Sequence, residues 1–214
     1  DQQNPWKAPR AALVTGGLGA LGFEVAFWLA KQGVQYLFLL GNTILPPRSE
    51  WTNIKDLRLK TKIEQILSLE AMGANVYYSG IDVSDRDGLV KEIEVTEAKW
   101  QLKIDGVFHL AGITTDSILI EDTSESLLAS VFAPKVQGTL ALHETFKERF
   151  LNCFVLFSST SALPYFGING LIAYAAANAF MDGFAYYRQS LGLPALSINW
   201  TSWAEKGMSF EHKQ

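Results

Sequence analysis

Tyr174 and Asn178 carry side chains that could act together on one substrate atom. They stand at the two ends of Tyr-Ala-Ala-Ala-Asn, and residues four apart share one face of a helix. A phenol, whose ordinary pKa is about 10, protonates a developing alkoxide at neutral pH more readily when a nearby cation lowers that pKa. The segment contains no lysine, so we expect the cation to be Lys135 in Phe-Ala-Pro-Lys-Val-Gln-Gly.

A run of hydroxyl side chains could complete this acid–base set. Ser158-Ser159-Thr160-Ser161 follows an apolar stretch, and one of its serines could hold a carbonyl oxygen. Asn178 would then fix Lys135 and relay water. The alternative is structural, with Tyr174 as a helix-face aromatic and Lys135 as a solvated surface residue. The catalytic interpretation is favoured because these residues occur together with a glycine-rich segment.

That glycine-rich segment is Thr15-Gly16-Gly17-Leu18-Gly19-Ala20-Leu21-Gly22. It follows a predicted strand and opens a predicted helix, and Gly16, Gly19 and Gly22 have the spacing G-x-x-G-x-x-G. Positions without a side chain allow the turn and let a pyrophosphate reach the N-terminal N–H groups of the helix. The alternative is a turn that binds no ligand. Because of its place between strand and helix, we predict dinucleotide binding.

Two further strand ends could contact the same ligand. Asp82 and Val83 suit a hydrogen bond to an adenine amino group, or they belong to the capped start of a helix at Ser84. Ala111 and Gly112 would let the nicotinamide-side ribose approach closely, or they form an ordinary tight turn.

The residues after the second predicted strand bear on the choice of dinucleotide. NAD-binding proteins usually carry an acid about 20 residues beyond the glycines, where it holds the ribose 2′-hydroxyl. Here Gly41 and Asn42 occupy that place, so no acid would repel a 2′-phosphate. This favours NADP, with Asn42 beside the phosphate and Arg48 or Arg10 supplying the cation.

Short apolar runs and longer helical patterns alternate along the chain. The predicted strands are 11–15, 36–40, 75–79, 107–110, 153–157 and 195–199. The predicted helices cover 18–31, 59–72, about 84–100, 124–149 and 172–191. This alternation predicts an α/β fold with a doubly wound parallel sheet of the Rossmann type. Ligands of such sheets bind at the carboxyl ends of the strands, where every segment named above falls.

The length and composition of the chain exclude several classes of function. The chain has 214 residues, 48% of them hydrophobic and 19% charged, which predicts one folded domain over residues 1–214. A net charge of −4 gives no support to nucleic-acid binding, and no apolar run approaches a membrane span. One cysteine and three scattered histidines have no metal-ligand spacing, so we expect no metal. These features indicate a cytoplasmic protein.

The chain resembles the catalytic subdomain of the ketoreductase domains of modular polyketide synthases, in the short-chain dehydrogenase/reductase superfamily. The segments that carry the resemblance are 14–19, 108–112, 134–138, 156–159, 174–182 and 197–200. Tyr-x-x-x-Asn with an upstream lysine is the specific part. The resemblance implies NADPH-dependent reduction of a β-ketoacyl thioester on an acyl carrier protein to a β-hydroxyacyl thioester. It also implies neighbouring megasynthase domains.

The chain departs from the family pattern at several points. The family usually has Arg where this chain has Asn42, and Trp-Gly-Pro-Trp where it has Trp-Thr-Ser-Trp at 200–203. Ser161 has the family's separation of 13 residues from the tyrosine, but the Phe-Ser-Ser text matches Ser159, which we favour. We expect residues 1–214 to lack the family's lid helix and seventh strand, which either a larger polypeptide supplies or which are missing. Thr114-Thr115-Asp116 matches only the last residue of the Leu-Asp-Asp that is typical of one alcohol configuration, and it favours that configuration.

Two other functions fit the same sequence motifs. One is reduction of an α-ketoacyl thioester, as in depsipeptide-making synthetases. The other is a non-reducing structural domain of a megasynthase, which Asn42 and the altered 200–203 segment would suit.

Overall fold

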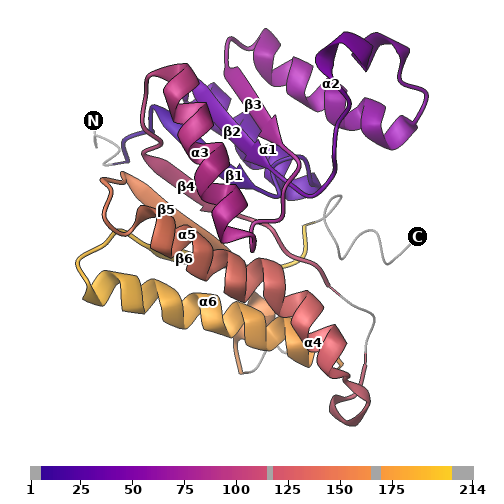
Figure 1. The fold of residues 1–214 in the computed structure, drawn as a ribbon. Helices are drawn as coiled ribbons and strands as arrows, with labels where there is room; N and C mark the ends of the chain where they lie inside the picture. The colour runs from indigo at the N-terminus through magenta and orange to yellow at the C-terminus, as the bar shows by residue number, and fades with distance from the viewer. Residues whose placement is uncertain (1–5, 115–117, 165–169, 204–214) are drawn as a thin grey trace.

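The fold is built on six parallel strands. The structure is a computed structural model that describes residues 6–114, 118–164 and 170–203. The strands stand in the order β3-β2-β1-β4-β5-β6 (Figure 1). They are β1 (Ala11–Thr15), β2 (Tyr36–Leu40), β3 (Asn75–Ser79), β4 (Gly106–His109), β5 (Cys153–Ser159) and β6 (Leu196–Trp200). The predicted doubly wound α/β fold is thereby confirmed.

Helices cover both faces of the sheet, which is why its central strands are apolar on both sides. In β1, Ala11 and Leu13 pack in a core with α3 (Arg86–Trp100), α5 (Gly138–Phe146) and α6 (Ile172–Ser190). Ala12 and Val14 face the other way, toward α1 (Ala20–Lys31) and α2 (Leu57–Ala71). Figure 1 shows α3, α5 and α6 lying over one face of the sheet.

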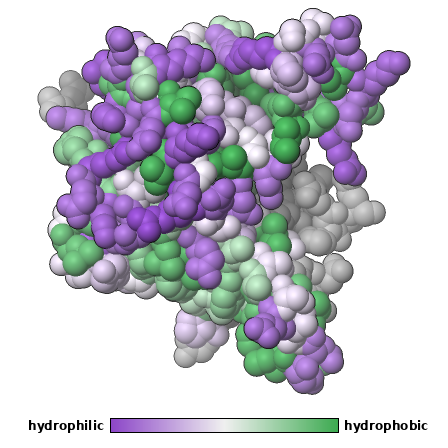
Figure 2. Space-filling view, in the orientation of Figure 1, coloured by the Kyte–Doolittle hydropathy of each residue, from purple (hydrophilic) through white to green (hydrophobic). Residues whose placement is uncertain are grey.

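Hydrophilic and hydrophobic residues are unevenly distributed over the outer surface. In Figure 2, hydrophilic residues cover much of the face that carries α3, and hydrophobic residues gather over α5 and α6. Leu140 of α5 and Leu191 beyond α6 are 38% and 51% exposed. No helix within the described residues is both long enough and apolar enough to cross a membrane.

The ends of the other helices shift by one or two residues, and two predicted helices differ from those observed in their cap or their continuity. The helix expected to be capped by Ser84 begins at Arg86, and Asp85 caps it by accepting the N–H of Gly88 at 3.1 Å. The expected helix 124–149 is three pieces: α4 (Glu125–Phe132), the π-helical turn Ala133–Gln137, and α5. The interruption contains Pro134, whose nitrogen has no hydrogen to donate to the preceding turn.

Strand order creates the place for a ligand. The chain runs outward from β1 to β3, returns to β4 on the other side of β1, and continues outward to β6. Loops leaving β1 and β4 therefore diverge at their carboxyl ends, which opens a crevice between them.

Gly22 is the tightest contact between α1 and the turn that precedes it. A Cβ at Gly22 would overlap the carbonyl oxygen of Gly16, whereas a Cβ at Gly183 in α6 would meet nothing within 4 Å. We expect Gly22→Ala to lower the free energy of unfolding by about 2 kcal/mol or more, because backbone must move. Gly183→Ala should raise it by about 0.5–1 kcal/mol, since alanine favours a helix interior. Urea denaturation of both variants measures this, and equal effects would contradict the packing described here.

Candidate active site

One cleft of about 940 Å³ at the carboxyl edge of the sheet brings most of the predicted site residues together. Its lining includes Thr15, Gly16, Leu18, Gly19, Gly22, Asn42, Asp82, Val83, Ala111, Gly112, Lys135, Ser159 and Tyr174. Two predicted residues lie behind this surface. Gly17 packs against Leu39, where a Cβ would come within 2.9 Å, and Asn178 is fully buried beneath Tyr174. Gly17 therefore shapes the turn without lining the cleft.

The glycine turn exposes backbone donors at the start of α1. Gly16 has a φ of +66°, a left-handed conformation that side chains disfavour, and its carbonyl accepts the N–H of Gly19 at 2.8 Å. No side chain caps the N-terminus of α1. Its first N–H groups and the positive end of the helix dipole are thus open to an anion, which fits the pyrophosphate of a dinucleotide.

Thr15 connects this turn to the loop after β4. Its Oγ1 accepts the N–H groups of Leu110 and Ala111, each at 3.1 Å, and donates to Nδ1 of His109 at 2.6 Å. Burial lowers the pKa of His109 to about 3, so the imidazole is neutral. Because Thr15 Oγ1 already accepts two N–H groups, its own hydrogen is left for Nδ1, which we assign as the ring nitrogen without a hydrogen. One hydroxyl thus holds the ends of β1 and β4 in register beside the cleft.

Lys135 reaches the cleft from the π-helical turn and is almost completely buried, with 2% of its surface exposed. Its Nζ donates to the carbonyl of Phe157 at 3.1 Å and lies 5.5 Å from the centre of the Tyr174 ring. Burial lowers the pKa of Lys135 to about 8, and the charge of Asp182 opposes that shift. Gly112 makes room for it, because a Cβ there would come within 2.7 Å of Lys135 Cε.

Tyr174 lies at the start of α6, over Lys135 and beside Ser159 at the end of β5. Burial raises the pKa of Tyr174, and hydrogen bonding with Asn178 and Ser159 offsets part of the rise. The net direction differs from the lowering expected from a nearby cation. Desolvation of the phenolate outweighs the other contributions, so the phenol is protonated at neutral pH.

Asn178 has a different contact from the one expected. Its Nδ2 donates to the backbone carbonyl of Tyr174 at 2.8 Å, one helical turn back. The hydrogen bonds of Lys135 Nζ among the described residues go to Phe157 O and Met181 Sδ, so a bond from Asn178 to Lys135 is not formed. Asn178 instead holds the first turn of α6, which carries Tyr174.

The structure also separates the two candidate serines. Ser159 is the serine that interacts with Tyr174, and its Oγ accepts the N–H of Ser161 at 3.2 Å. The hydroxyl of Ser161 is buried without a hydrogen-bond partner among the described residues. This arrangement favours Ser159, whose catalytic role stays a prediction.

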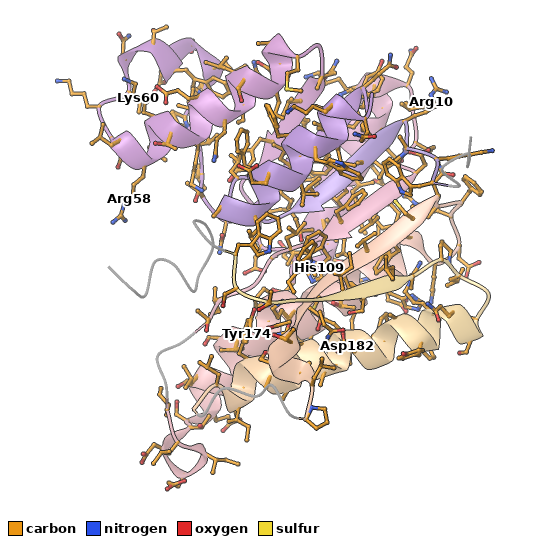
Figure 3. All side chains as sticks on the ribbon, turned by 180° about the vertical axis from the view of Figure 1, so that it is seen from behind. Arg10, Arg58, Lys60, His109, Tyr174 and Asp182 are labelled. Carbon is orange, nitrogen blue, oxygen red and sulfur yellow. The ribbon has the colours of Figure 1, made fainter. Side chains whose placement is uncertain are left out.

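A polar cluster behind the tyrosine was not assigned from the sequence. Asp182, four residues beyond Asn178, accepts Ser197 Oγ and Asn199 Nδ2, the latter at 2.7 Å. Asn199 also donates to the carbonyl of Ser159 at 3.2 Å. Figure 3 shows Tyr174 and Asp182 projecting from the same helix toward the sheet. The signal available in the sequence was the i, i+4 repeat Tyr174, Asn178, Asp182 on one helix face.

At the adenosine end of the cleft, Asp82 and the two predicted arginines have contacts other than those expected. Asp82 Oδ1 accepts both the N–H and the Oγ of Ser84, at 2.8 and 2.7 Å, so part of this carboxylate has a structural role. Neither predicted arginine lines the cleft. Arg48 pairs with Glu70 and stacks on Trp51, and Arg10 precedes β1 at the opposite edge of the sheet from Tyr174 (Figure 3).

Two expectations about the substrate side have different outcomes. Trp200, Thr201, Ser202 and Trp203 all line the cleft, and Trp200 stacks on Phe157 with ring centres 5.6 Å apart. The segment 200–203, which departs from the family's sequence pattern, therefore lines the cleft. Thr115 and Asp116 lie outside the described residues, so the indication of alcohol configuration stays a prediction.

A parallel sheet of this order, a glycine turn at β1 and a Tyr–Ser–Lys cluster at the edge define a short-chain dehydrogenase/reductase. The family described as "KR domain" matches residues 11–205. The chain is 42% identical over 199 residues to a 6-methylsalicylic acid synthase of Aspergillus niger, covering 92% of this chain and 11% of that protein. The chain thus spans about a tenth of the length of such relatives.

Solved structures agree with this match. A-type ketoreductases from a modular polyketide synthase give a TM-score of 0.79 at 33% identity, over 91% of this chain and 38% of theirs. A keto acid-selecting NRPS module with a ketoreductase gives 0.78 at 28% identity, over 96% of this chain and 16% of its own. The chain belongs to the KR family, the ketoreductase domains of polyketide synthases.

Thr15 allows a test of the link between β1 and β4. Thr15→Val removes the acceptor of the partly buried Ala111 N–H and the donor to the buried His109, so we expect the free energy of unfolding to fall by about 2 kcal/mol. Thr15→Ser keeps the hydroxyl and should recover most of that loss. Urea denaturation distinguishes them, and equal stability of Val and Ser would show that the hydroxyl contributes nothing.

Lys135 should leave a signature in the pH dependence of stability. Its pKa of about 8 in the folded chain lies below the ordinary 10.5, so the unfolded chain binds more protons between these values. Stability attributable to this group therefore rises with pH across that window, by up to about 3 kcal/mol. We expect Lys135→Met, which removes the buried charge, to be more stable at pH 7. Its advantage should narrow from pH 8 to 10 in guanidinium titrations, and a constant difference would contradict the shifted pKa.

Proposed function

We propose that this domain reduces a β-ketoacyl thioester, carried on an acyl carrier protein, to a β-hydroxyacyl thioester with NADPH. One observation carries the proposal: a protonated tyrosine, a serine hydroxyl and a buried ammonium meet in the same cleft as an open glycine turn. This combination suits protonation of a carbonyl oxygen beside a bound dinucleotide.

Each residue has a role that follows from its contacts. Ser159 holds the keto oxygen, and Tyr174 gives its phenolic proton to that oxygen. Lys135, positive at neutral pH, stabilises the phenolate that is left. Asn178 keeps the first turn of α6, and so Tyr174, in position. NADPH, when bound, supplies the hydride to the keto carbon; the glycine turn, Val83, Ala111 and Gly112 would hold it.

The raised pKa of Tyr174 suits an acid, because the group must carry its proton until the carbonyl oxygen gains negative charge. The ammonium of Lys135 then matters after proton transfer, when this almost completely buried charge faces the phenolate. Charge stabilisation in such a site exceeds that in water.

The relatives support an acyl thioester as the substrate. The chain matches part of synthases such as that making 6-methylsalicylic acid, and these are far longer than this domain. We infer that the carrier protein and neighbouring domains of one megasynthase deliver the substrate. The match to a keto acid-selecting module makes an α-ketoacyl thioester the second candidate.

Tyr174→Phe should decide whether the domain is a reductase. We expect its turnover, followed as NADPH consumption with a β-ketoacyl thioester, to fall roughly 10²–10⁴-fold because the acid is removed. Tyr186→Phe is the matched control, since Tyr186 lies on the same helix with 74% of its surface exposed. It should react like the unchanged protein.

The same assay separates the alternatives. Faster reduction of an α-ketoacyl thioester than of the β-keto substrate would support the second candidate. If the folded protein turns over neither thioester, the domain is a non-reducing structural domain.

A further inference from the structure

Lys62 is a cation in the cleft for which the proposed mechanism has no use. It lies on α2, with the side chain partly buried, and its Nζ donates to the carbonyl of Leu18 in the glycine turn at 3.2 Å. It lines the cleft together with Gly41, Asn42 and Thr43, the residues that follow β2. Lys62 therefore stands between the glycine turn and the end of the second strand.

The charges lining the cleft leave Lys62 without an anionic partner. Among the described residues the charged groups of this lining are Lys62, Lys135 and Asp82, and Asp82 is engaged with Ser84. No ion pair found in the described part of the chain includes Lys62. Burial lowers its pKa, which means that its charge is incompletely solvated. An ammonium so placed gains from a nearby anion.

Other basic groups near this end of the cleft are turned to other partners. Lys60, two residues earlier on α2, lies 3.9 Å from Glu64 and points away from the protein (Figure 3). Arg48 is held by Glu70. Of the cations on or before α2 in the described chain, Lys62 is the one that lines the cleft.

NADPH differs from NADH by a phosphate on the 2′-oxygen of the adenosine ribose, and in this fold that ribose lies beyond the second strand. Three features converge there. Gly41 and Asn42 carry no acidic side chain. The hydroxyl of Tyr78 donates to the carbonyl of Thr43 at 2.6 Å and so fixes the segment after β2. The ammonium of Lys62 supplies a positive charge. An ammonium has three donors, of which Leu18 engages one, so two are available to phosphate oxygens.

We propose that Lys62 binds the 2′-phosphate and thereby selects NADPH over NADH, an inference that rests on the proposed reductase function. It assigns to α2 the cation that the sequence had placed at Arg48 or Arg10. The cost of keeping a partly buried ammonium without a carboxylate is then offset when the cofactor is bound.

Calorimetric titration with two nucleotides tests this without requiring turnover. The probes are adenosine 2′,5′-bisphosphate and AMP, which share everything except the 2′-phosphate. We expect Lys62→Gln to weaken binding of the bisphosphate about tenfold or more, because a charged hydrogen bond is lost, and to leave AMP binding unchanged. Lys60→Gln makes the same charge change on the same helix and should alter neither. Lys62→Arg should keep most of the preference.

The outcomes separate this inference from the proposal on which it depends. If Lys62→Gln loses no more bisphosphate affinity than Lys60→Gln, Lys62 is not the selecting cation, although the reductase proposal stands. Equal loss for both nucleotides would also overturn it, since Lys62 would then act by holding the carbonyl of Leu18. If the unchanged protein binds neither nucleotide, the cofactor site and the reductase function fail together.

Discussion

The buried ammonium of Lys135 is the constraint on which the rest of the site depends. Removing a lysine from water is unfavourable, and the fold meets that cost with one carbonyl, one thioether and the nearby charge of Asp182. Gly112 must lack a side chain for the lysine to fit. The π-helical turn that presents Lys135 interrupts an otherwise continuous helix, and such turns are frequent at functional sites. The buried lysine and the interrupted helix lower the local stability, and they place a positive charge beside the phenol of Tyr174.

The cleft is held together by contacts between elements that are far apart in the chain. Thr15 joins the end of β1 to the loop after β4, and Asn199 of β6 bonds both Asp182 of α6 and the carbonyl of Ser159. These contacts connect the glycine turn to the tyrosine through the sheet edge. The glycine turn and the tyrosine are thus joined through hydrogen bonds at one edge of the sheet, an arrangement that would favour fixed distances between the groups that line the cleft.

Prediction from the sequence succeeded where structure follows from local periodicity. The first three strands were predicted with their observed bounds, because each is a short apolar run between turn residues. Prediction failed where two neighbouring residues could each cap a helix, and where a helix is interrupted. Asp85, rather than Ser84, stands at the N-cap of α3 and accepts the N–H of Gly88, whereas the N–H and hydroxyl of Ser84 both donate to Asp82. The break at Ala133–Gln137 was missed since the apolar pattern continues through it.

By itself, the sequence determined the doubly wound sheet, the glycine turn and the pairing of Tyr174 with Asn178, because period, spacing and i, i+4 geometry are local properties of a chain. Ser159 was already favoured from the sequence. Only the tertiary structure set Ser159 against Tyr174, brought Asp182 and Asn199 behind the tyrosine, and placed Lys62 instead of Arg48 or Arg10 in the cleft. Those outcomes depend on strand register and on how each helix packs against the sheet. Neither is encoded in the spacing of the residues concerned, since Lys62 stands 44 positions from the carbonyl it contacts.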